Sequence, residues 1–322
     1  MSAKALAHPN IAFIKYWGNR NHPLRLPANG SISMNLDGLH SITSVRFDGA
    51  LGADELVLGG DIQTGATLKR VSDFLELVRE KSGVKHFARV ESENNFPIGS
   101  GVASSSSAFA ALALAASKAA GLDLGERELS ALARRGSGSA SRSVPGGYVE
   151  WFAADDDRES YAASIASPEH WDLVDCVAIV DDEHKATVSS DGHRLADSSP
   201  LQAARLAGVD ERLKTVREAI LARDFSRLIK TVELDSHLMH AVMMTSEPPL
   251  LYWHPATLRV LHGTAQWRAK GMELCATIDA GPNVHVISPA KDADTIFAKL
   301  SELEGVKEVL RATPGGPARL IA

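Results

Sequence analysis

A glycine- and serine-rich segment, Phe96–Ala108, leads directly into an alanine-rich stretch that ends near Gly121 and is expected to be helical. Gly99 and Gly101 let the backbone bend and approach a ligand closely. The serines cap the helix and offer hydroxyls to phosphate oxygens or Mg²⁺. The segment is typical of a loop that holds nucleotide phosphates, although a capped turn that binds nothing has the same composition.

Lys15 interrupts an otherwise apolar stretch near the N-terminus, Asn10–Gly18. A buried lysine needs an anion, so Lys15 is suited to pair with a carboxylate or phosphate and to hold it ionised. The alternative is a lysine whose stem is buried and whose ammonium reaches the surface.

Basic side chains and hydroxyls alternate with glycine in Arg134–Ser143, and the flexible pair Gly146-Gly147 follows. Donors of three kinds can converge there on an oxyanion, and Arg142 can hold a carboxylate or phosphate through two parallel hydrogen bonds. A polar surface turn would look similar. Two anion sites would suggest two anionic substrates.

Asp279 is expected at the tip of a tight turn, Asp279–Asn283, between two apolar strands. An aspartate held there can act as a base or polarise a hydroxyl, provided that a cation such as Lys15 keeps it charged. Aspartate is also common in turns because it bonds its own backbone.

Asp235, His237 and His240 recur at helical spacing, which a metal site could use. Because no third strong ligand accompanies them, we interpret them as ordinary polar groups of a helix and predict no zinc.

The composition is that of an ordinary globular protein, with 322 residues, 44% hydrophobic content and a formal net charge of −6. The negative charge gives no general attraction to nucleic acid or anionic lipid. Cys176 and Cys275 suggest neither a disulfide framework nor a metal site, which fits a reducing cytoplasm. The N-terminus lacks a hydrophobic signal region, and the longest apolar run, Ala108–Ala116, is too short to span a bilayer. We expect a cytoplasmic protein that binds small molecules, not nucleic acid or membrane.

Hydrophobic periodicity predicts an α+β protein with two lobes and no internal repeat. The expected strands are 31–36, 42–47, 86–91, 146–152, 173–180, 274–278, 284–287 and 306–310. The expected helices are 68–83, a segment ending near 121, 126–134, 211–222, 225–239, 255–270 and one through Ile296 and Leu300. The polar stretch 181–200 is expected to be a lobe boundary or mobile loop, so we divide the chain into an N-terminal lobe, 1–185, and a C-terminal lobe, 186–322.

Five motifs in order resemble the mevalonate diphosphate decarboxylase and phosphomevalonate decarboxylase family of the GHMP kinase superfamily. They are Asn10–Ala12 with Lys15–Gly18, Glu93–Pro97, Gly101–Ser105, Arg135–Ala140 with Arg142-Ser143, and Asp279–Asn283. The resemblance covers nearly the whole chain, and the last two motifs differ from those of the superfamily's simple kinases. It implies a two-lobed GHMP fold in which ATP and a phosphorylated mevalonate meet between the lobes, with Mg²⁺, and a homodimer.

The resemblance also implies roles for single residues. Asp279 would orient or deprotonate the C3 hydroxyl, Lys15 would hold Asp279, and Arg142 would hold the substrate carboxylate. Ser105 would contact the transferring phosphoryl group or its Mg²⁺. The residues implied at the 5-phosphate end are Tyr16, Asn19, Ser137, Gly138 and Ser139. Those implied at ATP are Ser92, Asn94, Pro97, Gly99, Ser100, Gly101, Ala103, Ser104, Ser105 and Lys185.

One departure from the family pattern bears on the substrate. Diphosphate-using members generally carry a second lysine four residues after the first, and here that residue is Asn19. Asp191 adds a negative charge in a loop where some members have an arginine. Because each lost charged contact costs roughly 1–3 kcal/mol, we favour mevalonate 5-phosphate, giving isopentenyl phosphate, over the 5-diphosphate. Arg20 or Arg25 could compensate, and the preference reverses if Arg25 reaches the substrate.

Three other functions are compatible with parts of the pattern. A small-molecule kinase of the superfamily would stop after phosphorylation and release no CO₂. A decarboxylase acting without ATP on a 3-phosphorylated mevalonate would have no need for the intact glycine-serine loop. A metabolite-binding protein without catalysis would have no reason to keep Lys15, Ser105, Arg142 and Asp279 together.

Overall fold

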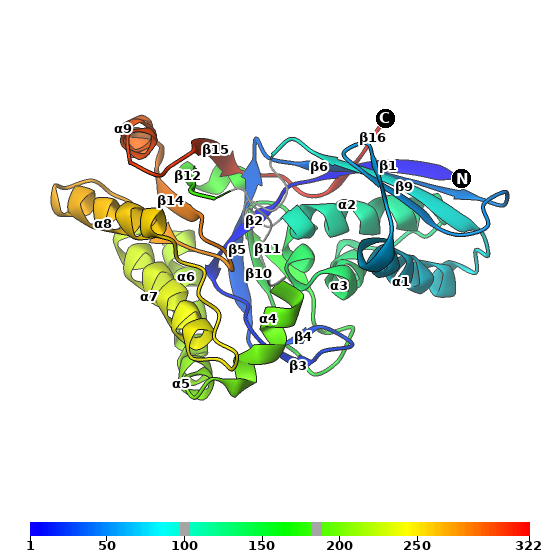
Figure 1. Cartoon of the computed structure of the whole chain (residues 1–322), viewed down its shortest axis with the longest axis horizontal. Coiled ribbons are helices and arrows are strands. Elements are labelled where there is room, and N and C mark those ends of the chain that lie inside the picture. Colours follow the sequence, from blue (N-terminus) through cyan, green and yellow to red (C-terminus); the bar gives the residue numbers. More distant parts are fainter. Residues whose placement is uncertain (97–103, 182–188) are drawn as a thin grey trace.

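The computed structural model describes residues 1–96, 104–181 and 189–322, without the side chains of 189–191. Within these residues the strands form two large sheets and one small ribbon, and helices pack against both large sheets (Figure 1). The ribbon consists of β3 (Asn19–Asn21) and β4 (Leu26–Pro27). The mixed fold with two lobes agrees with the α+β prediction.

The first sheet lies in the lobe that contains both termini (Figure 1). Its strands, in spatial order, are β16 (Arg319–Ile321), β1 (Ser2–Ala7), β6 (Ser41–Asp48), β9 (Phe87–Asn94), β7 (Glu55–Leu58) and β8 (Asp61–Gln63). Pairing is antiparallel except between β7 and β9. The register of the antiparallel pair β6 and β9 places Ser92 and Asn94 of β9 opposite Thr43 and Ser41 of β6.

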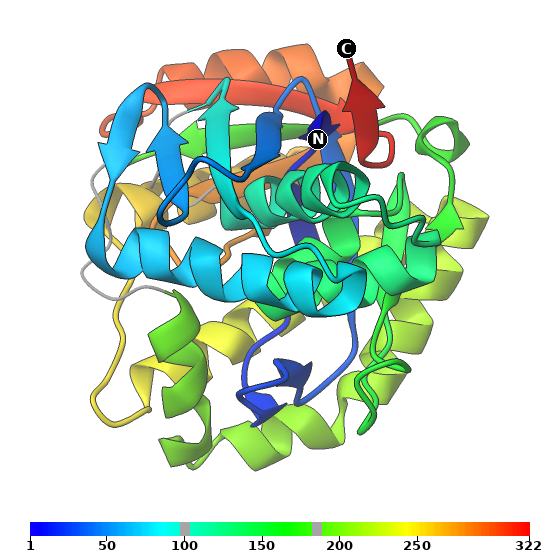
Figure 2. The same cartoon turned by 90° about the vertical axis from the view of Figure 1, so that its right-hand side faces the viewer.

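Three helices share one hydrophobic core with the first sheet, and all lie on the same side of it (Figure 2). They are α1 (Gly65–Ser82), α2 (Ser104–Ala119) and α3 (Glu126–Gly136), and the short 3₁₀ helix η1 (Gly138–Ser143) follows directly. The small alanine side chains of α2 let it lie close to β1 and β6. Gly83 ends α1 as predicted, because it adopts a left-handed backbone with φ of 75° and its N–H bonds the Arg79 carbonyl.

The second sheet combines strands from both halves of the chain. Its path is β11 (Ala162–Ala166), β10 (Tyr148–Trp151), β5 (Ser31–Asp37), β15 (Glu308–Pro314), β12 (Leu173–Ile179), β14 (Val284–Pro289) and β13 (Cys275–Thr277). A further strand, β2 (Asn10–Ile14), pairs with β5. This pairing brings the N-terminal Lys15 segment into the same layer as the β13–β14 turn.

Helices flank both faces of the second sheet (Figure 1). Because side chains alternate along a strand, Leu173 and Val177 of β12 join the core beneath α6 (Val209–Ala222) and α7 (Phe225–Met244). Val174 and Cys176 face the core formed with α8 (Pro255–Ala269) and α9 (Ala290–Ser301). Burial on both faces explains the continuous apolar run that predicts this strand.

The polar stretch expected to be a loop contains helical structure in its described part, so that prediction is wrong for residues 189–198. These residues form α4 (Ser189–Leu195) and the 3₁₀ helix η3 (Ala196–Ser198), and α5 (Gln202–Ala207) follows. Ala196 and the indole of Trp17 pack into one small buried cluster, which gives the segment an apolar anchor. The proposed division at residues 185 and 186 stays a prediction.

No helix in residues 1–96, 104–181 or 189–322 combines the length and hydropathy that crossing a membrane requires.

Candidate active site

The site is built around a buried ion pair between residues that are 264 positions apart in the sequence. Lys15 directly follows β2, and Asp279 begins the turn between β13 and β14. The Lys15 Nζ donates to Asp279 Oδ1 at 2.6 Å, and the lysine side chain is 1% exposed while the aspartate side chain is 24% exposed. The predicted pairing of Lys15 with Asp279 is therefore present, and the carboxylate retains access from outside.

Burial and nearby charges act differently on the pKa values of the two members of this pair. Burial lowers the pKa of Lys15, although the Asp279 carboxylate opposes that effect. Burial alone would raise the pKa of Asp279, but Lys15, His285 and Arg142 together hold it below its ordinary value of 3.8. Asp279 is consequently a carboxylate at neutral pH, as a group that orients or accepts a proton from a hydroxyl must be.

Arg142 lies in η1 and is buried, so it does not belong to a polar surface turn. Its guanidinium donates to Asn10 Oδ1 at 3.0 and 3.2 Å and to Ser31 Oγ at 2.6 Å. Within the described residues it forms no ion pair with a carboxylate, and burial lowers its pKa to about 10. A buried cation held only by neutral acceptors is suited to bind an anion from outside the protein.

A row of hydroxyls connects the start of α2 with η1. Ser105 Oγ lies 3.2 Å from Ser137 Oγ, which lies 3.4 Å from Ser139 Oγ. Ser104 and Ser105 stand at the start of α2 as far as the structure describes that helix. The candidate phosphoryl contact, Ser105, is thus beside two of the predicted substrate residues.

Tyr16 and Asn19 lie next to this row. The Tyr16 hydroxyl donates to Asn19 Oδ1 at 2.5 Å, and burial raises the pKa of Tyr16 to about 12, which keeps the phenol protonated. A Cβ on Gly138 would lie 2.5 Å from the Tyr16 ring, so only glycine lets the ring pack against that backbone. Tyr16, Asn19 and Gly138 therefore form one continuous surface beside Ser137.

Arginines gather on the outer side of Tyr16. Arg25 has a left-handed backbone with φ of 51° and donates from Nε to the Arg135 carbonyl at 3.0 Å. Burial lowers its pKa, and the charges of Arg135 and Arg194 lower it further, whereas Tyr16 opposes them. Arg70 donates to the Gly136 carbonyl, and burial followed by the charge of Arg25 lowers its pKa to about 10. Among the described residues, neither Arg25 nor Arg70 forms an ion pair with a carboxylate.

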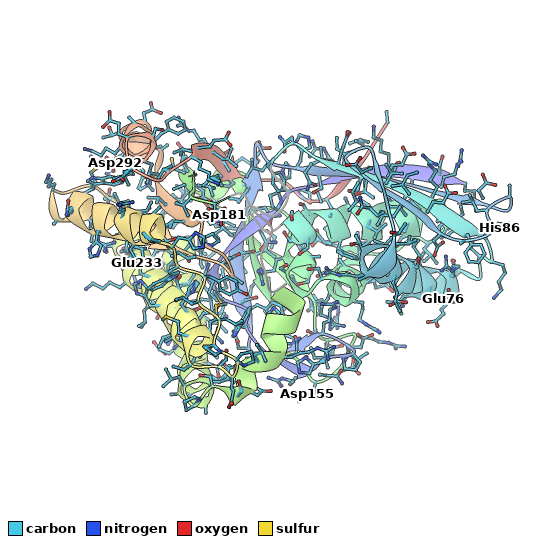
Figure 3. The ribbon with its side chains drawn as sticks, in the orientation of Figure 1. Glu76, His86, Asp155, Asp181, Glu233 and Asp292 are labelled. Carbon is cyan, nitrogen blue, oxygen red and sulfur yellow. The ribbon has the colours of Figure 1, made fainter. Side chains whose placement is uncertain are left out.

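Arg20, the other arginine of this N-terminal segment considered above, is fully engaged elsewhere. It donates to the Pro27 and Ala28 carbonyls and pairs with Asp155 at 2.6 Å. Asp155 lies at the edge of the molecule beside the β3–β4 ribbon (Figure 3). Arg25, not Arg20, is thus the arginine available near Tyr16.

Two of the predicted ATP residues lie on β9. Ser92 Oγ is 2.8 Å from Thr43 Oγ1, and Asn94 Oδ1 accepts from Ser41 Oγ, which in turn lies 2.6 Å from Ser107 Oγ of α2. The structure therefore connects Asn94 to the first turn of α2, and the role of both residues stays a prediction. Pro97, Gly99, Ser100, Gly101, Ala103 and Lys185 lie outside the described residues, as does the side chain of Asp191.

The structure adds three residues to those for which the sequence predicts a role: Asn10, Ser31 and His193. Asn10 and Ser31 hold Arg142, and Asn10 also donates to Ser143 Oγ at 2.8 Å. His193 stacks on Tyr16 with ring centroids 4.1 Å apart, and burial and nearby arginines lower its pKa to about 3. The neutral ring accepts the Gly18 N–H at Nδ1. Asn10 belongs to the first motif, whereas Ser31 and His193 become visible only through tertiary contacts.

Comparison with known proteins places these features in a family. A family model described as the diphosphomevalonate decarboxylase-like N-terminal domain matches residues 7–162, and one described as the mevalonate 5-diphosphate decarboxylase C-terminal domain matches residues 176–314. A diphosphomevalonate decarboxylase from Ganoderma lucidum is 35% identical, over 89% of this chain and 78% of its own length. A phosphomevalonate decarboxylase from Haloferax volcanii is 32% identical, over 100% of this chain and 98% of its own length.

A solved structure described as "MDDEF in complex with MVAPP, AMPPCP and Magnesium" is 38% identical, with a TM-score of 0.95 over 100% of this chain and 99% of that chain. The architecture is thus the two-lobed GHMP type that the sequence predicts. The chain belongs to the mevalonate diphosphate decarboxylase family.

Proposed function

We propose that this protein catalyses the ATP-dependent decarboxylation of mevalonate 5-diphosphate to isopentenyl diphosphate. The observation that carries the proposal is the 2.6 Å contact of Lys15 with the partly exposed Asp279 carboxylate, whose pKa is also lowered by the charge of Arg142. This arrangement supplies a charged base and a cation that has only neutral partners among the described residues, which suits the alcohol and the carboxylate of such a substrate.

ATP is the proposed phosphoryl donor, with Mg²⁺ as its metal. The support is a relative of 38% identity that is described in complex with AMPPCP and magnesium. In this chain, the Ser105 hydroxyl is a group that suits a phosphate oxygen or its metal. We assign Ser104, Ser105, Ser92 and Asn94 to the ATP side of the site. Mg²⁺ would offset negative charge on the phosphates.

The residues can divide the reaction into two steps. Asp279 accepts the proton of the C3 hydroxyl while that oxygen attacks the γ-phosphorus of ATP, and the bond to ADP breaks. The C3–O bond then breaks to release phosphate, and the electron pair of the carboxylate–carbon bond forms the alkene as CO₂ leaves. Arg142 holds the carboxylate in place, and the negative charge of Asp279 favours the positive charge that develops at C3.

Two observations favour the 5-diphosphate over the 5-phosphate that Asn19 suggested. Most of the similar proteins of known name, including the Ganoderma lucidum enzyme, are diphosphomevalonate decarboxylases. Arg25 lies near Tyr16 and Arg70 lies near Arg25, so two guanidinium groups without carboxylate partners among the described residues are close together, and a second phosphate needs such charges. Arg25 thereby replaces the contact that a lysine at position 19 would make.

Mevalonate 5-phosphate is the second candidate substrate. Asn19 favours it, and so does the similarity to the Haloferax volcanii enzyme, which is named as a phosphomevalonate decarboxylase. The test is the ratio of kcat/KM for the two substrates, measured with saturating Mg-ATP under identical conditions. A higher value for the diphosphate supports the proposal, whereas a higher value for the monophosphate overturns it.

We extend the family resemblance to assembly and location, and propose a homodimer in the cytoplasm. Sedimentation equilibrium of the purified chain tests the first part, and a single species of monomer mass at micromolar concentration contradicts it.

A further inference from the structure

We infer that helix α7 fixes the separation of Lys15 and Asp279, through Asp235 on the lysine side and Ser236 on the aspartate side. Both are positioning residues, and the inference rests on the catalytic roles proposed above for the ion pair. Asp235 and Ser236 are consecutive, fully buried residues of α7, the long helix that lies against β2 and β13.

Asp235 holds the backbone of Lys15. Its Oδ2 accepts the Lys15 N–H at 2.6 Å, while its Oδ1 accepts from Arg212 Nε at 2.7 Å. Lys15 lies one residue beyond β2, and the register of β2 against β5 shifts between Ala12 and Ile14. A backbone group that leaves a sheet inside the protein needs another partner, and Asp235 supplies it.

The Lys15 carbonyl is held by Arg205 of α5 and by Asn29, which lies between β4 and β5. It accepts from Arg205 Nη2 at 2.7 Å and from Asn29 Nδ2 at 2.9 Å. Arg212 donates to the Arg205 carbonyl at 2.7 Å, which links the two holding groups to one another. The backbone on both sides of the Lys15 side chain is therefore tied to α5, α6 and α7.

Ser236 holds the other partner of the ion pair. Its Oγ accepts the Ile278 N–H at 3.0 Å and lies 3.4 Å from the Ile278 carbonyl oxygen, to which it donates. Ile278 immediately precedes Asp279, and β13 ends one residue earlier at Thr277. One hydroxyl thus fixes the backbone at the base of the turn that carries the carboxylate.

Since neighbouring residues of one rigid helix hold both backbones, a displacement of either contact changes the geometry of the ion pair. Misplacement by about 1 Å can lower a rate about a hundredfold. Asp235 also acts through its charge, because its carboxylate favours the ammonium form of Lys15. This second effect gives Asp235 a signature that a purely structural residue lacks.

The experiment compares Asp235→Asn and Ser236→Ala with the matched control Asp54→Asn. Asp54 is also buried and accepts from an arginine, Arg79, and from a backbone N–H, that of Ala88, but it lies in the first sheet. For each variant we measure kcat, the KM values for Mg-ATP and for mevalonate 5-diphosphate, the pH dependence of kcat, and the thermal unfolding temperature. Rates are normalised to folded protein.

We expect kcat to fall about tenfold to a hundredfold in Asp235→Asn and Ser236→Ala, with KM unchanged. In Asp235→Asn the alkaline decline of kcat moves to lower pH, because the Lys15 ammonium loses a nearby negative charge. In Ser236→Ala the alkaline decline of kcat stays at the wild-type pH. Ser236→Thr, which keeps a hydroxyl, recovers activity. Asp54→Asn unfolds at lower temperature but keeps kcat and its pH dependence.

The inference is wrong if Asp235→Asn and Ser236→Ala keep the wild-type kcat, or if Asp235→Asn behaves like Asp54→Asn. Asp279→Asn, measured beside them, separates this result from a failure of the proposed function. An inactive Asp279→Asn with normal positioning variants rejects only the inference. A fully active Asp279→Asn rejects the catalytic roles on which it rests.

Discussion

Charges at the Lys15–Asp279 pair are matched, whereas Arg25, beside Tyr16, and the neighbouring Arg70 are not paired in this way. Lys15 and Asp279 pair at 2.6 Å, and buried groups bond the backbone of Lys15 and that of Ile278, which precedes Asp279. Arg25 and Arg70 donate to carbonyl oxygens, and in the described residues neither has a carboxylate partner. Under the proposed function, the two regions have different tasks: the matched pair would be held in place for the reaction, and the unmatched arginines would bind the negative charge of the substrate.

Breaking the matched pair at its base gives the largest expected effect. Asp279→Asn removes the group that accepts the hydroxyl proton, so turnover falls about a thousandfold, while binding of ATP persists. Release of CO₂ and calorimetric titration with Mg-ATP measure the two quantities. Near-normal turnover would mean that the Lys15–Asp279 pair is structural and does not take part in the reaction.

Arg142 is a third arginine that has no carboxylate partner among the described residues, and unlike Arg25 it is buried. Arg142→Gln lowers kcat/KM about a hundredfold, because the substrate carboxylate loses a desolvated, charge-assisted partner. Arg142→Lys does not restore activity, since an ammonium cannot make two parallel bonds. Arg311→Gln is the control, because Arg311 is an exposed residue that pairs with Asp294. A loss of equal size in the control would contradict the assignment.

The pairing of Lys15 with Asp279 also predicts how the free energy of unfolding depends on pH. Lys15→Met leaves the Asp279 carboxylate without its cation, so the free energy of unfolding at neutral pH falls by about 1–3 kcal/mol. In wild type the folded pKa of Asp279 is lowered, so its stabilisation is present above the unfolded value of 3.8 and is lost as pH falls through the folded pKa. In Lys15→Met we expect that pKa to rise above the unfolded value, and the stability deficit therefore shrinks as pH approaches about 4.

Urea unfolding of wild type and Lys15→Met across that pH range measures the deficit. A deficit that stays constant with pH would show that lost packing of the lysine stem, not lost charge matching, accounts for it.

The smallest expected effect is a change in KM on substitution of Arg25, one of the unmatched arginines. Arg25→Gln raises KM for mevalonate 5-diphosphate about tenfold, equivalent to about 1.4 kcal/mol, and changes KM for the monophosphate less. Arg20→Gln is a close control because it removes the same charge from the same segment, where Asp155 already pairs with it. Equal changes in both variants would assign the effect to net charge rather than to a contact.

The sequence predicts those parts of the site that depend on local composition or on the family resemblance. Lys15, Asp279, Arg142 and Ser137 lie in recognisable motifs, and the structure brings Lys15 to Asp279 as expected. Helices with a strong apolar period, such as α1 and α7, also appear close to their predicted limits. These patterns lie within short stretches of sequence, so they can be recognised without knowledge of the fold.

Features that depend on distant contacts could not be predicted in this way. β1 is held between β6 and β16, and the short β16 joins the sheet only by pairing with β1 across the two ends of the chain. Asp235 looked like an ordinary polar residue of a helix, because nothing in its neighbourhood indicates that α7 meets Lys15. Arg25 likewise acquires its meaning from Arg135 and Tyr16, which only the folded chain places beside it.

The most direct test of the account is the stoichiometry of one reaction. Wild-type protein is incubated with mevalonate 5-diphosphate and Mg-ATP, and ADP, phosphate and CO₂ are measured over the same time course. The account predicts equal amounts of all three and no CO₂ without ATP. ADP release without CO₂ would identify a kinase, and CO₂ release without ATP would contradict the proposed mechanism.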